Sequence, residues 1–147
     1  MPVQDFIGTY VAQMTVGYAG MIAEGQIVKD VASKVVTTAV VPFGLAVGLG
    51  AVDNSVRLGG GGYIGVTVSD KTRAADQYAV GEVAGVMRKG TIWVTADGAV
   101  TDASVVTYTE ATGVIGARSV ATGIVAIPGA KFETTAADGA LVRVYLG

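Results

Sequence analysis

Short alternations of apolar and polar residues dominate the chain from about residue 35 onward, and they predict β-strands. Valine, threonine, isoleucine and tyrosine fill these stretches, and glycine separates them every few residues. The last stretch alternates most clearly, since Val142, Val144 and Leu146 fall on one face while Arg143 and Tyr145 fall on the other. We predict strands at residues 35–41, 44–49, 62–68, 83–88, 91–95, 104–109, 113–115, 124–127, 131–134 and 140–146.

Turn residues fall between the predicted strands. Asp97-Gly98 and Asp138-Gly139 predict hairpin turns, because tight hairpin turns need a positive φ at one or both central positions. Pro128-Gly129 is predicted to separate two further short strands. Many short strands without an internal repeat favour an all-β domain over residues 35–147, either a closed barrel or a sandwich.

The N-terminal segment has a different pattern. Phe6, Tyr10, Met14 and Tyr18 recur every four residues, so they could line one side of a helical turn or two. Four interspersed glycines weaken a continuous helix, by about 1 kcal/mol each relative to alanine. We therefore predict a mainly extended arm over residues 1–34, which either packs on its own domain or docks on a partner.

The composition excludes several kinds of chemistry. The chain has no cysteine and no histidine, which excludes a disulfide framework, a thiolate zinc site and every catalytic arrangement built on either residue. Its 10 basic and 12 acidic residues are scattered, so no basic stripe marks a nucleic-acid surface. No apolar run reaches the roughly 18 residues of a membrane-spanning helix, and no signal peptide is evident. We expect no nucleic acid, membrane, metal or other cofactor as a partner.

Charge is scarce along the whole chain. Charged residues make up 15% of it, against about 25% in ordinary soluble domains, while hydrophobic residues make up 51%. Such a chain has little charge with which to cover its surface. Contacts between identical subunits, or a large partner surface, would remove that shortage.

A run of four glycines raises the question of a nucleotide site. Gly60, Gly62 and Gly65 match the spacing G-x-G-x-x-G, which can mark a loop that binds phosphates. Such a site needs a helix after the last glycine, with its N-terminus facing the pyrophosphate. Here the stretch VTVSD follows and alternates like a strand. We therefore interpret residues 59–62 as a sharp turn into a strand that starts near Tyr63.

No catalytic constellation stands out in the sequence. Asp97, Asp102 and Glu110 lie close together along the chain, but nothing marks two of them as the coupled pair of a glycosidase. Ser33 and Lys34 are adjacent, which on a strand directs their side chains to opposite faces. We expect no catalytic residues and no enzymatic activity.

Five segments occur along the chain in an informative order. They are GYAGMIAEG at 17–25, VPFGLAV at 41–47, YIGVTV at 63–68, YAVGEVAGVMRKGTIWVT at 78–95 and GALVRVYLG at 139–147. Together they resemble the capsid cement, or decoration, proteins of tailed bacteriophages. The stretch 78–95 is the most specific, because VGE, RKG and IWV follow one another within it.

The resemblance implies a small β-barrel or jelly-roll-like domain with an extended N-terminal arm. It also implies a structural protein of the virion, made in the host cytoplasm, that binds the outer surface of the phage head. It would stabilise contacts between subunits of the major capsid protein and act as a homo-oligomer, with a dimer favoured and a trimer possible. Phe6, Tyr10, Met14 and Tyr18 on the arm are then the expected contacts with the capsid or with a sister subunit.

Two alternatives to the cement function remain open from the sequence. One is another structural β module of the virion, associated with a tail or a fibre. The other is a carbohydrate-binding module, in which the single tryptophan, Trp93, would stack on a sugar. A lone tryptophan in a β domain more often belongs to a core or an interface.

Overall fold

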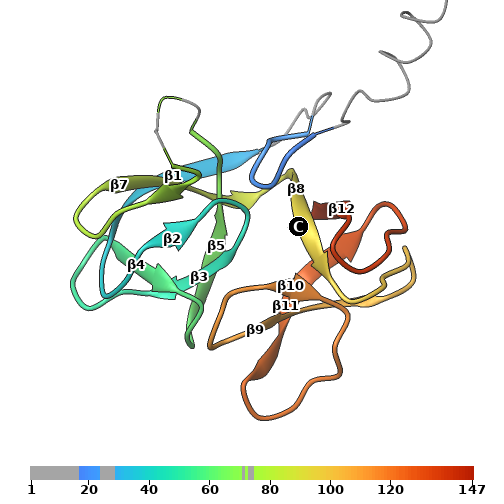
Figure 1. Cartoon of the computed structure of the whole chain (residues 1–147). Helices are drawn as coiled ribbons and strands as arrows, with labels where there is room; N and C mark the ends of the chain where they lie inside the picture. The colour runs from blue at the N-terminus through green and yellow to red at the C-terminus, as the bar shows by residue number, and fades with distance from the viewer. Residues whose placement is uncertain (1–16, 24–28, 71, 73–74) are drawn as a thin grey trace, which may run out of the picture.

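The computed structural model describes residues 17–23, 29–70, 72 and 75–147, and these consist of strands, turns and loops. Ten of the strands form two closed barrels that lie side by side (Figure 1). The strand order is β1-β4-β3-β5-β7 in the first barrel and β10-β8-β12-β11-β9 in the second, while β2 and β6 form a small separate sheet. The all-β barrel prediction is confirmed. Within the described residues, no helix is long and apolar enough to cross a membrane.

The chain completes one barrel before it begins the other. The first barrel contains β1 (Asp30–Val36), β3 (Ala46–Leu49), β4 (Ser55–Leu58), β5 (Tyr63–Thr67) and β7 (Val83–Lys89). The second contains β8 (Thr91–Asp97), β9 (Val105–Thr109), β10 (Ile115–Gly116), β11 (Ile124–Phe132) and β12 (Leu141–Tyr145). The small sheet pairs β2 (Val41–Pro42) with β6 (Gln77–Tyr78). Gly90 alone separates β7 from β8, so the chain passes between the barrels within one residue.

The strands differ from the sequence prediction by more than their end residues in three places. The strand predicted at 35–41 is instead β1, which ends at Val36 before Thr38 turns the chain with a positive φ of 76°. Pro128-Gly129 does not separate two strands, because β11 continues through it with an irregular register against β9; such a bulge tolerates a proline that cannot donate to the ladder. The sequence analysis missed β4 and β6, which are too short to show an alternation.

Only one of the two Asp-Gly turns lies between strands that pair with each other. Gly98 and Gly139 both have positive φ, 87° and 79°, as tight turns require. The second turn lies between β11 and β12, which pair antiparallel. The first turn follows β8, but β8 pairs with β12 and β10 and not with the next strand, β9. The predicted hairpin at Asp97-Gly98 is therefore wrong, although the turn itself is present.

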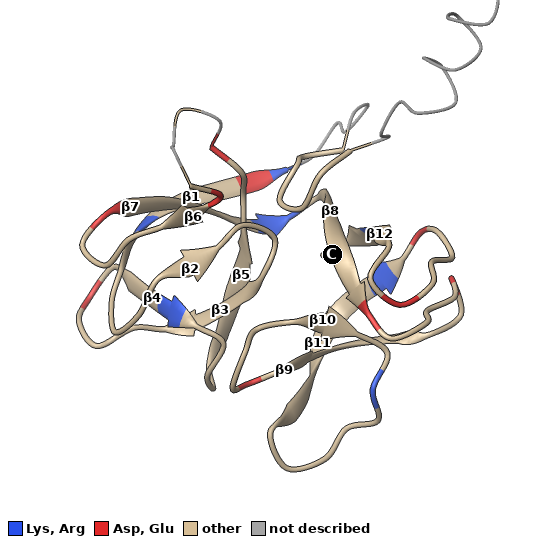
Figure 2. Cartoon of the chain, viewed as in Figure 1, with Lys and Arg blue, Asp and Glu red and all other residues tan. Residues whose placement is uncertain are grey.

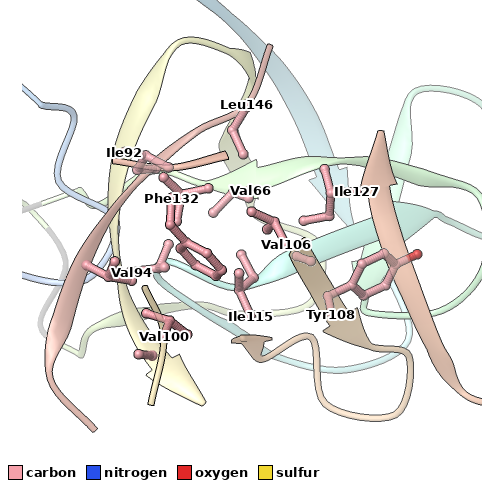
Figure 3. Packing of buried hydrophobic residues seen from close by; sticks show 14 of the residues in the cluster. Val66, Ile92, Val94, Val100, Val106, Tyr108, Ile115, Ile127, Phe132 and Leu146 are labelled. Carbon is pink, nitrogen blue, oxygen red and sulfur yellow. The ribbon is translucent and has the colours of Figure 1, made fainter. Parts of the chain in front are cut away.

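One hydrophobic core connects the two barrels. It fills the second barrel, where Phe132 and Ile115 are almost completely buried (Figure 3). Ala46, Val66 and Met87 of the first barrel belong to the same buried cluster. A second, smaller cluster fills the rest of the first barrel. Because the larger core is shared, we expect the two barrels to unfold together.

Candidate functional site

The glycine turn, residues 59–62 between β4 and β5, packs against the second barrel. The Gly60 amide donates a hydrogen bond to the carbonyl oxygen of Glu110 at 2.7 Å. In return, the Tyr108 hydroxyl donates to the carbonyl oxygen of Gly60 at 2.9 Å. These bonds cross from one barrel to the other, so the glycine turn joins the barrels at a contact that we call the barrel seam.

Glycine is required in this turn for two physical reasons. Gly59, Gly60 and Gly62 have φ of 58°, 75° and 69°, the left-handed region that other residues adopt only with strain. A Cβ atom on Gly59 would overlap the carbonyl oxygen of Glu110. The strand β5 begins at Tyr63, directly after the turn, as predicted. The spacing that resembles a nucleotide loop therefore serves a tight turn and a close backbone approach.

Two tyrosines lie beside the glycine turn with their ring centroids 5.6 Å apart, Tyr63 and Tyr108. The Tyr63 hydroxyl is buried and has no hydrogen-bond partner among the described residues. Burial raises the pKa of Tyr63, and the neighbouring Tyr108 raises it further. Burial also raises the pKa of Tyr108, with a smaller contribution from Glu110. Both phenols therefore remain protonated at neutral pH.

The different hydrogen bonding of Tyr63 and Tyr108 predicts different changes in the free energy of unfolding when each is replaced by phenylalanine. Tyr108→Phe should lower the free energy of unfolding by about 1 kcal/mol, because the hydrogen bond to Gly60 is lost. Tyr63→Phe should leave that free energy unchanged or raise it slightly, since it removes a buried hydroxyl that has no partner. Urea unfolding measures both variants, and equal losses would contradict the arrangement.

Residues 17–23 lie along the edge of β8, where they make a turn and Ile22 forms an isolated antiparallel β-bridge with Ile92. The Gly20 amide donates to the carbonyl oxygen of Trp93 at 2.8 Å, and the Trp93 amide donates to that of Met21 at 2.9 Å. This edge is available because β10 pairs only with the last two residues of β8. The segment also contacts the loop that follows β5 of the first barrel, because the Ser69 amide donates to the Gly20 carbonyl oxygen at 2.8 Å.

One of the four predicted arm contacts lies in the described structure. Tyr18 lies in the segment 17–23 that follows the edge of β8, and it is 39% exposed. It lines a groove of about 210 Å³ together with Pro42 and Phe43. Phe6, Tyr10 and Met14 lie outside the described residues, so their role stays a prediction.

Trp93 is half-buried and has neighbours around its ring. A Cβ atom on Gly17 would lie 3.2 Å from the indole, so this glycine packs against the ring. The Arg143 guanidinium carbon lies 6.0 Å from the ring centroid, within the range of a cation–π contact. The tryptophan thus forms part of the contact between the N-terminal segment and the second barrel, as expected for an interface residue.

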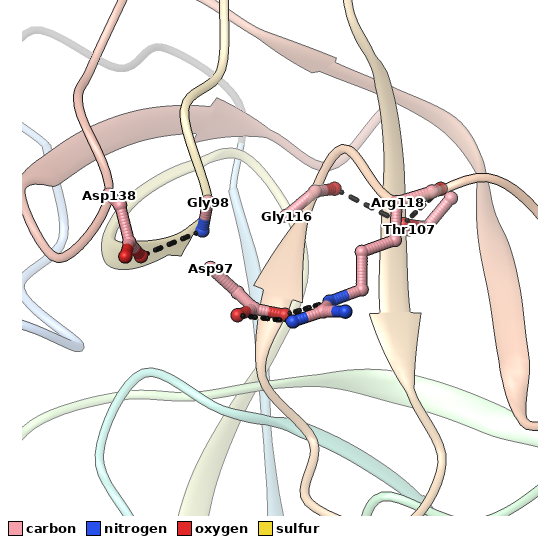
Figure 4. Close-up of polar contacts among 6 residues, drawn as sticks. All are labelled: Asp97, Gly98, Thr107, Gly116, Arg118 and Asp138. Atoms are coloured by element: carbon pink, nitrogen blue, oxygen red, sulfur yellow. Dashed lines mark hydrogen bonds and ion pairs between the residues drawn. The ribbon is translucent and has the colours of Figure 1, made fainter.

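The aspartates of the two Asp-Gly turns, Asp97 and Asp138, have structural partners. Arg118 forms a two-bond ion pair with Asp97, at 2.6 and 3.2 Å (Figure 4). Asp138 accepts a hydrogen bond from the Gly98 amide at 2.9 Å (Figure 4). In the part of the chain that the structure describes, no three carboxylates gather in the way a metal ion would need.

The Asp97–Arg118 pair makes a pH prediction. The hydrogen bond from Arg118 lowers the pKa of Asp97 below its ordinary value of 3.8; partial burial opposes this shift and the charge of Arg118 adds to it. A carboxylate with a lowered pKa stabilises the fold above its ordinary pKa, and the stabilisation is lost as pH falls through the lowered value. Arg118→Ala should therefore have a slightly lower Tm than the natural chain near neutral pH. The difference in Tm should disappear as the pH falls below 3.8 and Asp97 becomes protonated. Thermal unfolding across pH tests this, and a constant difference would contradict it.

Much of the remaining surface is apolar. Figure 2 shows charged residues scattered thinly over the barrels. The exposed large hydrophobic residues are Tyr18, Val31, Val40, Leu49, Val52, Val80, Val83, Val105, Val120 and Tyr145. Val40, Val52, Val80 and Val120 among them lie in turns and loops between the strands. The surface therefore offers apolar contact area to a partner.

The chain is similar to known proteins in both its sequence and its fold. Residues 6–147 match the family described as structural cement protein (E217 gp24/Pam3 gp6). A chain in the structure titled "The capsid of Myoviridae Phage XM1" is similar with a TM-score of 0.70 and 18% identity, over 92% of each chain. The N base of the head fibre gp8.5 of bacteriophage phi29 has a TM-score of 0.51 and 11% identity, over 82% of this chain and 95% of that one. No curated protein is significantly similar. At these identities the two structures show a common fold.

Proposed function

The chain belongs to the structural cement protein family of phages, and from this premise we propose where and how it acts on the capsid. It binds the outer surface of the assembled head and contacts the major capsid protein across the junctions between its subunits. The observation that carries the proposal is the family match, which extends over both barrels and most of the N-terminal arm. Its role is structural and not catalytic, and it acts as a homo-oligomer, with a dimer favoured.

The geometry supports a cement role in two ways. The shared core and the barrel seam make the two barrels one unit, which can transmit force between the capsid subunits that it connects. Exposed valines and sparse charge suit a surface that remains covered in the particle. Each contact can be weak, because many copies act together on one head.

The N-terminal arm supplies the second contact in this proposal. Backbone hydrogen bonds hold residues 17–23 against β8, so the segment that precedes them in the chain is attached at this edge. Sixteen residues precede Gly17, and an extended chain of that length reaches at most roughly 55 Å. We propose that this segment pairs with a neighbouring subunit, through backbone hydrogen bonds of the kind that add a strand to a sheet edge.

Deletion of residues 2–16 should weaken binding to heads and leave the barrels folded. The reason is that the backbone bonds described between residues 17–23 and the barrels all lie outside the deleted segment. Co-sedimentation with heads that lack the protein measures the binding, and circular dichroism checks the fold. The matched control keeps the length of the arm and replaces Phe6, Tyr10 and Met14 by alanine, which should cause part of the same loss. Unchanged binding by the truncated chain would show that the arm is not a contact.

A further inference from the structure

A groove of about 450 Å³ follows the barrel seam and contains charged groups from both barrels. Arg57 and Leu58 line it from β4 of the first barrel. Glu110 and Ala111 line it from the turn after β9 of the second barrel. The groove therefore contains one cation, one anion and apolar surface.

Neither charge in the groove has an ionic partner in the described residues. Arg88, Arg118 and Arg143 each form an ion pair with an acidic side chain, at 2.8, 2.6 and 3.2 Å. Within 17–23, 29–70, 72 and 75–147, no such pair involves Arg57 or Glu110. Arg57 is thus the exception among the described arginines of a charge-poor chain.

Both charged residues are held in place by the backbone around them. Arg57 pairs with Gly48 across the ladder between β4 and β3. Its Nε atom lies 2.6 Å from the position that a Cβ atom on Gly60 would occupy, so the side chain lies over the glycine turn. Glu110 is fixed by its carbonyl bond to Gly60 and by its amide, which donates to the Gly123 carbonyl oxygen at 2.8 Å. The two charged side chains therefore start from fixed backbone positions on the two barrels, one on each side of the seam.

We propose that this groove is the contact surface for a second copy of the chain, in which Arg57 of each copy pairs with Glu110 of the other. In a two-fold dimer the same patch meets itself, so a surface residue that contacts a different residue has that contact twice. A patch with one cation and one anion is complementary to its own copy, and Leu58 and Ala111 add apolar area between the two pairs. The inference rests on the homodimer proposed above and assigns its surface.

Charge reversal and its compensation test the proposal on the full-length chain. Arg57→Glu alone and Glu110→Arg alone each place like charges together twice and should weaken dimerisation at least tenfold in sedimentation velocity. The double variant Arg57→Glu/Glu110→Arg restores opposite charges, and its dissociation constant should return to within a few-fold of the natural one. Lys89→Glu makes the same charge change outside the groove and should leave dimerisation unchanged. Thermal unfolding confirms that each variant is folded.

Three results would overturn this assignment: a natural chain that is monomeric at high concentration, single reversals that dimerise normally, or a double variant that fails to recover. Head binding is measured separately, so that failure of the dimer surface is distinguished from failure of the cement function. Single reversals that remain dimeric but lose head binding would instead assign the groove to the capsid protein.

Discussion

Gly59→Ala is expected to lower the free energy of unfolding by roughly 3–5 kcal/mol, a loss large enough to threaten folding. Two costs combine at this position. The left-handed φ of 58° strains any residue with a Cβ atom. That atom would also overlap the Glu110 carbonyl oxygen and lie 2.9 Å from its carbon. Both are backbone atoms held in the barrel seam, so they cannot move aside as a flexible side chain would.

Gly61→Ala provides the matched control within the same four-glycine turn. Gly61 is exposed, has no positive φ, and an added Cβ atom there would meet nothing within 4 Å. We expect its Tm to equal that of the natural chain or to exceed it slightly, because alanine restricts the unfolded chain. Differential scanning calorimetry compares the two variants. Similar stabilities for Gly59→Ala and Gly61→Ala would show that the seam is not as close as described.

Phe132→Ala should lower the free energy of unfolding by about 3–5 kcal/mol. The residue is 2% exposed and belongs to the same buried cluster of the second barrel as Ile92 and Val94 of β8 (Figure 3). Its removal leaves a cavity that a closed barrel cannot fill by moving its strands together. Val105→Ala, on β9 of the same barrel, is the control, since Val105 is 66% exposed and should change the stability by less than about 0.5 kcal/mol.

The same variant tests whether the barrels are coupled. Ala46, Val66 and Met87 of the first barrel share the core in which Phe132 lies. A loss of packing in the second barrel should therefore lower the stability of the first as well. Hydrogen exchange of β3 and β5 amides reports on the first barrel. If these amides keep their protection while the second barrel opens in Phe132→Ala, the shared core does not couple the barrels.

Several local features could be predicted because they depend on neighbouring residues in the chain. The alternation in β12 and the β-branched stretches of β7 and β8 indicate strands without reference to a partner. The alternating stretch around Gly65, which is now seen to belong to β5, indicates a turn into a strand and not a nucleotide-binding loop. The short strands β4 and β6 could not be predicted, because they are stabilised by pairing with distant residues and not by their own pattern.

The candidate surfaces could not be predicted from the sequence for the same reason, because their residues are far apart in the chain. Arg57 and Glu110 are 53 positions apart, as their numbers show, and neither belongs to a motif. They line one groove only because the glycine turn brings the barrels into contact. Likewise, the sequence marks Trp93 as unusual but does not show that residues 17–23 pair with its strand.

The amino-acid sequence by itself determined the all-β class, the glycine turn before Tyr63, the absence of histidine and cysteine chemistry, and the resemblance to phage cement proteins. These properties follow from residue type and local spacing. Only the tertiary structure decided that the strands close into two barrels, that one core connects them, and that glycine is required at the seam. Barrel closure depends on register between strands far apart in the chain, and a close backbone approach depends on which segments meet; local pattern specifies neither.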